Sequence, residues 1–237
     1  MLINKNSMDD RKKAIFSDVL EEYIRSAKPI GSKVIVDKYY KDLSSATIRN
    51  EMKALEKEGF ITHPHTSAGR IPTEKGYQFY IDNFLEEKEV AKKDREEIQK
   101  AIGSFKQFEP DLVKTIAKTI AHLSDETVFV AFSQNDFYYT GLSNIFKKPE
   151  FAELEVVYNL SEIIDHMDEV MSAMFEDVDK TTILLGKENP FGNICSSVLT
   201  KYHNKSQNGL FGILGPMRMD YNRNNSLVNF AERLLSS

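Results

Sequence analysis

Residues 44–71, SSATIRNEMKALEKEGFITHPHTSAGRI, decide the fold of the first part of this chain. Apolar side chains recur at Ile48, Met52 and Leu55, which is the i, i+4, i+7 spacing of one helix face. Either serine at the start of the stretch can cap such a helix, and Gly59 stands where a glycine commonly ends one. We therefore predict a helix with one apolar face and one polar, cationic face.

A short β-ribbon follows this helix. Phe60-Ile61-Thr62-His63 is a candidate strand, and Arg70-Ile71 can return as its partner after a turn from Pro64 to Gly69. No apolar side chain in this turn is larger than that of Ala68, so its tip cannot be buried in a core. We expect the tip to face solvent or a binding partner.

The flanking segments complete a winged helix-turn-helix. Apolar residues with helical spacing predict a helix over residues 10–26, and a Pro-Gly break then precedes a short helix over residues 33–40 with Ser32 as its N-cap. Thr73 is placed to cap a closing helix. Three helices, a ribbon and a fourth helix within residues 1–85 are the element order of that fold.

The remainder of the chain has a different character. Of the 15 residues from 86 to 100, 11 are charged, so we interpret residues 86–108 as a charged helical linker. Residues 109–237 are predicted to form an α/β domain, which gives the whole chain an α+β class. Its expected helices lie at residues 110–123, 151–175 and 220–235, and its expected strands at 127–133, 137–141, 182–186, 194–202 and 209–214.

Composition excludes several protein classes. The chain has 237 residues, enough for one or two domains, with 41% hydrophobic and 28% charged residues, which is a globular mixture. The longest apolar runs have about five residues, whereas a membrane helix needs about 20. The single cysteine, Cys195, excludes an internal disulfide framework and favours a reducing cytoplasm.

Charge is distributed unevenly along the chain. The net charge of −5 combines a basic start with an acidic remainder, because residues 1–80 hold 14 Lys+Arg and 11 Asp+Glu. A polyanion would therefore bind the first 80 residues, although an ordinary solvated surface can carry the same charge. This bias alone does not identify a function.

The polar face of the predicted helix after Ser44 carries side chains of the kinds that can bind DNA. Arg49 can bind a guanine edge through two hydrogen bonds, Asn50 can pair with adenine, and Lys53 suits a phosphate. The hydroxyls at the helix start and the polar ribbon can contact the DNA backbone or the minor groove. These further candidates are Ser44, Ser45, Thr47, His65, Thr66, Ser67 and Arg70. The alternative is a solvated amphipathic helix followed by an ordinary turn.

Several motifs resemble the heat-inducible transcription repressor HrcA family, in the same order along the chain. In the first part they are Glu22-Tyr23, Pro29-Ile-Gly-Ser32, Ser44-Ser-Ala-Thr-Ile-Arg-Asn-Glu-Met52, Leu55-Glu56, Gly59, Pro64-His-Thr-Ser-Ala-Gly-Arg-Ile-Pro-Thr73 and Lys75-Gly76-Tyr77. In the second part they are Gly141-Leu-Ser-Asn144, Pro149-Glu-Phe151, Gly186-Lys-Glu-Asn-Pro190 and Gly212-Ile-Leu-Gly-Pro-Met-Arg-Met-Asp-Tyr221. The resemblance covers residues 10–85 and 137–237 well and the residues between them poorly.

The resemblance implies a fold and a function. It implies a winged helix followed by a GAF-like domain, and a bacterial repressor that binds an inverted-repeat operator of heat-shock (chaperone) genes as a dimer. It further implies the chaperonin as a modulator, and a cytoplasmic location on the nucleoid when DNA is bound. The family carries early GAF-like strands and an inserted dimerising domain between Leu123 and Phe137, so we expect the inserted domain to be missing and the GAF-like core to be reduced.

One alternative function stays open at this point. The C-terminal domain could sense a small ligand and use the winged helix as its output. An enzyme is disfavoured because no nucleophile–base pair, metal motif or phosphate-binding motif stands out, and we accordingly predict no cofactor and no metal. His63 and His65 are too isolated to form a metal site.

Overall fold

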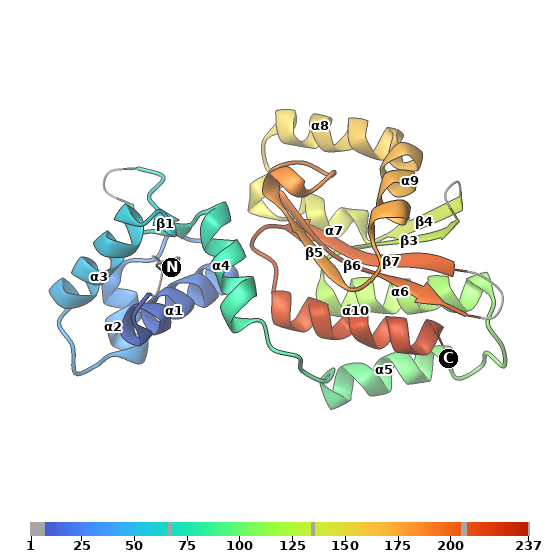
Figure 1. Ribbon diagram of the computed structural model, residues 1–237, viewed down its shortest axis with the longest axis horizontal. Helices are drawn as coiled ribbons and strands as arrows, with labels where there is room; N and C mark the ends of the chain where they lie inside the picture. Colours follow the sequence, from blue (N-terminus) through green and yellow to red (C-terminus); the bar gives the residue numbers. More distant parts are fainter. Residues whose placement is uncertain (1–7, 66–67, 134–135, 205–207, 237) are drawn as a thin grey trace, which may run out of the picture. The chain divides into compact units, whose positions relative to one another are not determined.

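The chain is described by a computed structural model (Figure 1) that covers residues 8–65, 68–133, 136–204 and 208–236. It divides into two units, residues 1–85 and 86–237, and each is described by itself below. Within the described residues, none of the helices is both long enough and apolar enough to span a bilayer.

The first unit is a winged helix-turn-helix, and every element expected from the sequence is present. Its two short strands pair antiparallel, with Ile61 opposite Pro72 and Thr62 opposite Ile71. The elements are α1 (Asp10–Ser26), α2 (Ser32–Tyr39), α3 (Ser45–Lys57), β1 (Ile61–Thr62), β2 (Ile71–Pro72) and α4 (Glu74–Phe84). The predicted winged helix is therefore confirmed.

Side-chain caps and an apolar core define these helices. Ser44 accepts a hydrogen bond from the backbone N–H of Thr47 at the start of α3, and Thr73 accepts one from Gly76 at the start of α4. Each such cap contributes about 1 kcal/mol. The core side chains of α1 and α3 are fully buried, and each contributes about 1.5–3 kcal/mol. They include Ile15, Phe16, Val19, Leu20, Ile48 and Leu55.

The start of α2 differs from expectation. Ser32 is the first helical residue and not the N-cap, a position that Gly31 occupies without any side-chain cap. The Ser32 hydroxyl instead forms a 2.8 Å hydrogen bond with the hydroxyl of Ser45 on α3. The Ser32 hydroxyl thus bonds to α3 and does not cap α2. The first backbone N–H groups of α2 therefore have no side-chain acceptor.

The second unit is built around a five-stranded antiparallel sheet with the strand order β4-β3-β7-β6-β5. Together with the helical content, it confirms the predicted α+β class. The strands are β3 (Thr127–Ser133), β4 (Asp136–Thr140), β5 (Thr182–Leu185), β6 (Cys195–His203) and β7 (Asn208–Pro216). The α-helices are α5 (Lys92–Ile102), α6 (Pro110–Ser124), α7 (Leu142–Phe146), α8 (Leu154–Asp165), α9 (Met167–Asp177) and α10 (Tyr221–Leu235), and the 3-10 turns are η1 (Pro149–Phe151) and η2 (Gly186–Glu188).

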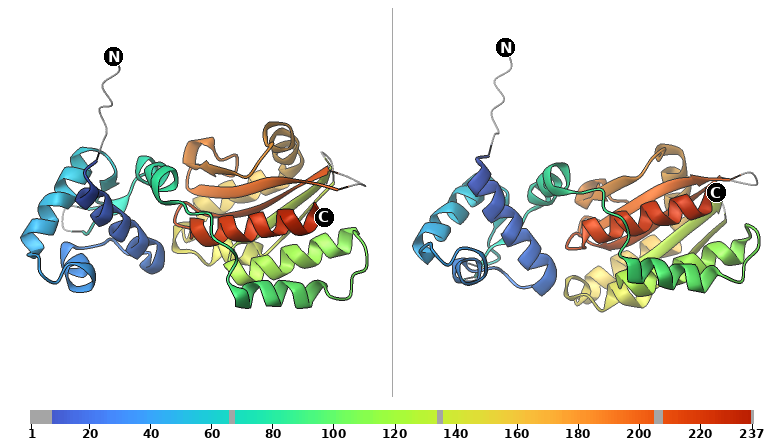
Figure 2. Two further views of the ribbon diagram at one scale, coloured as in Figure 1. Left: turned by 60° about the horizontal axis from the view of Figure 1, so that its bottom comes forward. Right: turned by 90° about the horizontal axis from the view of Figure 1, so that it is seen from below.

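Helices cover both faces of this sheet. α6 and α10 pack on one face, and Figure 2 shows α5 alongside them. The other face holds an apolar core to which α7, α8 and α9 contribute together with β3, β6 and β7. The sheet is therefore buried between two helical layers, which explains why Val128 to Ala131 form a continuous apolar run.

The charged segment after residue 85, predicted to be a helical linker, belongs to the second unit. Residues 92–102 form α5, which packs against α6 and buries Ile98 completely. Asp94 accepts a hydrogen bond of 2.9 Å from the guanidinium of Arg223 on α10. Apolar burial and this ion pair therefore attach a helix whose other side chains are mostly polar.

The region between Leu123 and Phe137 contains the strand β3, which lies between β4 and β7 in the sheet. α6 ends at Ser124 and β3 begins at Thr127, so no inserted domain separates them. The helix α7 follows Gly141, whose φ of +76° favours glycine. Sequence analysis did not identify α7 because five residues are too few to show a helical period.

Candidate nucleic-acid interface

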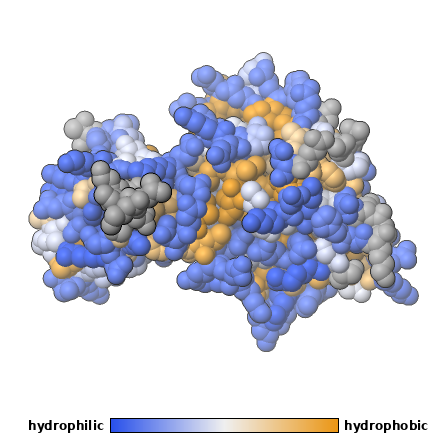
Figure 3. Space-filling model, in the orientation of Figure 1, coloured by the Kyte–Doolittle hydropathy of each residue, from blue (hydrophilic) through white to orange (hydrophobic). Residues whose placement is uncertain are grey.

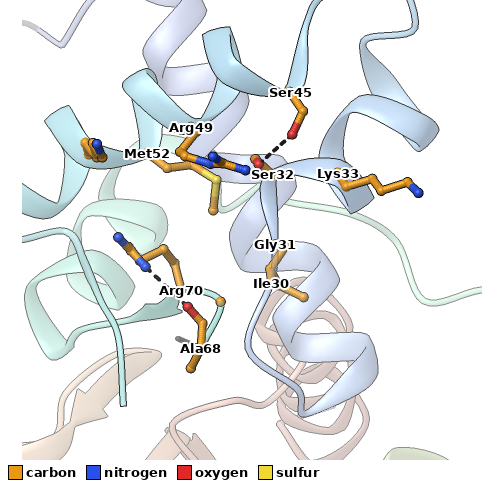
Figure 4. Close-up of a pocket in the computed structure, with 11 residues that line it drawn as sticks. Ile30, Gly31, Ser32, Lys33, Ser45, Arg49, Met52, Ala68 and Arg70 are labelled. Atoms are coloured by element: carbon orange, nitrogen blue, oxygen red, sulfur yellow. Dashed lines mark hydrogen bonds between the residues drawn. The ribbon is translucent and has the colours of Figure 1, made fainter. Parts of the chain in front are cut away.

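A cationic groove crosses the first unit between α3, the start of α2 and the base of the ribbon (Figure 4). Its volume is about 540 Å³, and its lining includes Lys33, Arg49, Lys53 and Arg70. None of the described lining residues is acidic. Lys33, Arg49 and Lys53 give this concave surface a positive potential that suits a polyanion, whereas the charge of Arg70 is paired with Glu56.

The DNA-contact candidates on α3 lie on the exposed face of the helix, as the apolar periodicity predicts. Ile48 and Met52 are buried beneath the helix, whereas Arg49, Asn50 and Lys53 are exposed on its outer face. Arg49 and Lys53 both line the cationic groove. The structure therefore brings the predicted base-reading arginine and the predicted phosphate-binding lysine onto one surface.

The hydroxyl candidates at the start of α3 are partly engaged within the unit. Ser44 caps the helix and also forms a 2.8 Å hydrogen bond with the hydroxyl of Thr47. Ser45 binds Ser32, as described above. In each of these two pairs, one hydroxyl donates its proton to the oxygen of the other. The second hydroxyl therefore keeps its own proton, which can be donated to a ligand oxygen.

The ribbon candidates have different positions. His65 is exposed, and Thr66 and Ser67 lie outside the described residues. The Arg70 side chain is bound to Glu56 and does not extend freely toward a ligand. Its Nε donates a hydrogen bond of 3.0 Å to Oε2 of Glu56, and its Nη2 lies 2.8 Å from the same Oε2 atom. Only 20% of the Arg70 side chain is exposed.

Glu56 of α3 joins the two ends of the ribbon. One carboxylate oxygen binds Nδ1 of His63 and the other binds Arg70. Burial would raise the pKa of Glu56, but the hydrogen bonds from His63 and Arg70 outweigh burial and hold it below its ordinary value. Glu56 therefore stays ionised near neutral pH.

Two residues of this surface were missed by sequence reasoning. Lys33 lines the groove from α2, and Glu56 holds Arg70 from behind the lining. Lys33 is the second residue of α2, directly after Gly31 and Ser32, and a cation at a helix start is a usable signal for an anion-facing position. Glu56 belongs to one of the family motifs, but no local pattern indicated its pairing with Arg70, which is 14 residues away.

The two units differ in surface character on the face that Figure 3 shows. The first unit is largely hydrophilic there, whereas apolar surface of the second unit lies over the edge strand β5. Three of the four side chains of β5 are only partly buried. A hydrophilic, cationic surface is typical of proteins that bind nucleic acids.

Sequence comparisons identify relatives of both units. The family model of the HrcA protein C terminal domain matches residues 78–224, and that of the Ribonuclease R winged-helix domain matches residues 18–79. A heat-inducible transcription repressor HrcA of Thermoanaerobacter sp. (strain X514) is 28% identical over an alignment covering 97% of this chain and 96% of that protein. The protein of that name from Thermobifida fusca (strain YX) is 40% identical over 134 residues, which are 56% of this chain and 38% of that protein.

A solved structure shares the fold of this chain. The crystal structure of a hypothetical protein at 2.2 Å resolution superimposes with a TM-score of 0.77 at 20% identity and covers 97% of this chain and 98% of that chain. By contrast, the alignment with the Thermoanaerobacter repressor spans 331 positions, more than the 237 residues present here. That relative therefore contains residues that have no counterpart in this chain.

The curated relatives are named transcription repressors, a role without catalysis. The match of the C-terminal family model extends over more than half of the residues, and the repressor motifs of the first unit surround the cationic groove. On this evidence, the chain belongs to the HrcA family.

Proposed function

We propose that this chain is a sequence-specific DNA-binding repressor of heat-shock (chaperone) genes that binds an inverted-repeat operator as a dimer. The observation that carries the proposal is the groove between α2, α3 and the ribbon, with four cations and no acidic residue among its described lining. The printed name of the relatives, heat-inducible transcription repressor, supports the regulated process.

In this proposal α3 enters the major groove. Arg49 and Asn50 are exposed on adjacent positions of its outer face, so both can reach base edges. A guanidinium binds O6 and N7 of guanine, and a carboxamide binds N6 and N7 of adenine. Lys53 lies one turn further along α3 and binds a phosphate, which adds affinity without sequence preference.

Phosphates would also contact the segments on either side of α3. The N–H groups at the start of α2 have no side-chain cap, and Lys33 lies beside them, so together they can hold a phosphate. The hydroxyl pairs Ser44–Thr47 and Ser32–Ser45 each keep one proton for the same purpose. These contacts would position α3 on the duplex.

The ribbon would follow the DNA backbone beside α3. His65, Thr66 and Ser67 are the proposed contacts at its tip. Arg70 sits at its base, where Glu56 already balances its charge, so its role is to donate hydrogen bonds and not to add net positive charge. The ribbon therefore contributes shape and hydrogen bonds more than electrostatic attraction.

Dimerisation follows from the reading length of a single helix. One recognition helix contacts about four base pairs, which are too few to select one site in a genome. Two copies related by a two-fold axis would read two half-sites one helical turn apart, and the operator would then be an inverted repeat. The second unit is the proposed source of the dimer contact.

Control of the repressor is proposed from the family resemblance. The chaperonin would act as modulator, so that its occupation by unfolded proteins during heat stress relieves repression. The repressor would act in the bacterial cytoplasm, bound to the nucleoid when it represses.

Binding to the upstream regions of the organism's own chaperone genes tests the proposal. Fluorescence anisotropy would compare an inverted-repeat duplex, its half-site and a scrambled duplex, each with and without chaperonin, and sedimentation would measure the oligomeric state. We expect a dimer that prefers the inverted repeat over scrambled DNA by about 10³-fold or more. Equal binding to all three duplexes would refute sequence-specific repression.

A further inference from the structure

The base of the ribbon is held from two sides. On one side the carboxylate of Glu56 binds His63 at the end of the first strand and Arg70 at the start of the second. On the other side Ile30 and Arg70 exchange two backbone hydrogen bonds of 2.8 Å. The start of α2, the recognition helix α3 and the ribbon thus meet at Arg70.

The contact with Ile30 leaves no room for a side chain at position 69. A Cβ atom at Gly69 would lie 2.6 Å from backbone atoms of Pro29 and Ile30, which is closer than real Cβ atoms approach. The backbone of the second strand is therefore packed directly on the turn before α2. On the other side, the contacts of Glu56 with His63 and Arg70 connect the ribbon to α3.

The charge of Glu56 makes its position unexpected. It pairs with Arg70, which lines the groove together with Lys33, Arg49 and Lys53, and it neutralises the charge of Arg70. A carboxylate beside a phosphate-binding surface repels DNA and weakens binding to any duplex. The charge of Glu56 thus opposes DNA binding. Any favourable contribution of Glu56 must therefore come from the way it positions other residues.

We propose that Glu56 is a positioning residue for operator recognition: by binding His63 and Arg70 together, it fixes the ribbon against α3 in the geometry that a specific duplex requires. The inference rests on the proposed function and adds a specificity-determining residue to it. Specific binding needs the ribbon and α3 to contact the duplex simultaneously, whereas non-specific binding needs only positive charge. Glu56 therefore raises discrimination while lowering general affinity.

Three variants separate geometry from charge. Glu56→Ala removes both the carboxylate and the contacts, and Glu56→Gln removes the charge but keeps an oxygen that accepts from Arg70. Glu51→Ala is the matched control, because Glu51 lies on the same helix, has a similarly exposed side chain (26% against 24%) and faces Arg11 of α1. The melting temperature of each variant is measured first, so that a loss of fold is recognised.

Competition titrations against operator and scrambled DNA give the decisive readout. For Glu56→Ala we expect operator affinity to fall about fivefold while affinity for scrambled DNA rises about twofold. Glu51→Ala should raise both affinities alike, and Glu56→Gln should keep the operator preference within about threefold of wild type. An unchanged preference in a folded Glu56→Ala variant would overturn the inference.

A double substitution tests whether Glu56 acts through Arg70. The variant combining Glu56→Ala with Arg70→Ala should discriminate no worse than Arg70→Ala alone, because the positioned group is already gone. If the double variant loses discrimination by the product of the two single-variant losses, Glu56 acts independently of Arg70. That result would also overturn the inference. If wild type itself fails to discriminate between the duplexes, the proposed function is refuted, a result distinct from either of these.

Discussion

Nζ of Lys148 lies 3.5 Å from Oε1 of Glu126, a carboxylate buried in the second unit with only 6% of its side chain exposed. The other oxygen, Oε2, is buried without a hydrogen-bond partner among the described residues. Burial raises the pKa of Glu126 to about 7, and attraction to Lys148 offsets only part of this increase. Glu126 therefore changes charge near physiological pH.

We expect this carboxyl group to make the stability of the second unit depend on pH. The folded-state pKa lies above the ordinary value of 4.5, so the stabilisation is fully present below pH 4.5 and is lost as pH rises through about 7. The loss between these limits is about 3 kcal/mol. The charged or titratable groups around Glu126 are Lys148, Asp125, Arg218 and Tyr221.

Glu126→Gln should remove most of this dependence. At pH 8 the variant should melt about 5 °C above wild type, whereas at pH 5 the two should differ little. Calorimetry at both pH values, with Glu155→Gln at an exposed position as a control for general charge effects, measures the difference. Parallel pH profiles for wild type and Glu126→Gln would contradict the prediction.

Arg49→Ala tests base reading by α3. Because a bidentate contact with guanine discriminates between bases, the substitution should weaken operator binding by about 1–3 kcal/mol and relax selectivity at one base step. Lys53→Ala should instead weaken binding to every duplex evenly. Titrations against operator and scrambled DNA distinguish the two, and equal losses on both duplexes for Arg49→Ala would exclude a base-reading role.

Lys33→Ala tests whether the start of α2 holds a phosphate. We expect weaker binding to all duplexes and a salt dependence lower by about 0.9 in log–log slope, as for one lost phosphate contact. Lys41→Ala removes the same charge from an exposed position that does not line the groove. Affinity measured from low to moderate salt concentration should distinguish Lys33→Ala from Lys41→Ala. If the two variants have the same salt dependence, Lys33 does not contact the DNA.

The buried carboxylate of Glu22 is expected to stabilise the first unit. It accepts hydrogen bonds from Arg25, Lys38 and Tyr39. Burial would raise the pKa of Glu22, but the hydrogen bonds from Lys38 and Tyr39 hold it below its ordinary value of 4.5. The resulting stabilisation is therefore present above pH 4.5 and is lost as pH falls through the lowered pKa.

Glu22→Gln should destabilise the first unit by about 1–3 kcal/mol at pH 7, because the charge-assisted hydrogen bonds become neutral ones. Below the lowered pKa of Glu22 the difference from wild type should disappear. Thermal denaturation followed by circular dichroism over this pH range provides the test. A variant as stable as wild type at pH 7 would show that the cluster is energetically neutral.

Local signals in the sequence determined most of the secondary structure. Residues 10–26 and 127–133 form the helix and the strand expected there, and Ser44 and Thr73 cap the helices that follow them. These features depend on neighbours within a few positions, through apolar periodicity and side-chain capping, so the order of residues alone specifies them. The polar outer face of α3 follows from the same periodicity.

Only the tertiary structure decided which distant groups meet. Arg70 has Glu56 as its partner across 14 positions, Lys33 enters the groove from a neighbouring helix, and the charged helix α5 packs on α6. Such contacts depend on the path of the chain between the two residues, and a local pattern carries no information about that path. The sequence therefore indicated which residues could contact DNA, while the fold determined that one of them, Arg70, is already bound to a carboxylate.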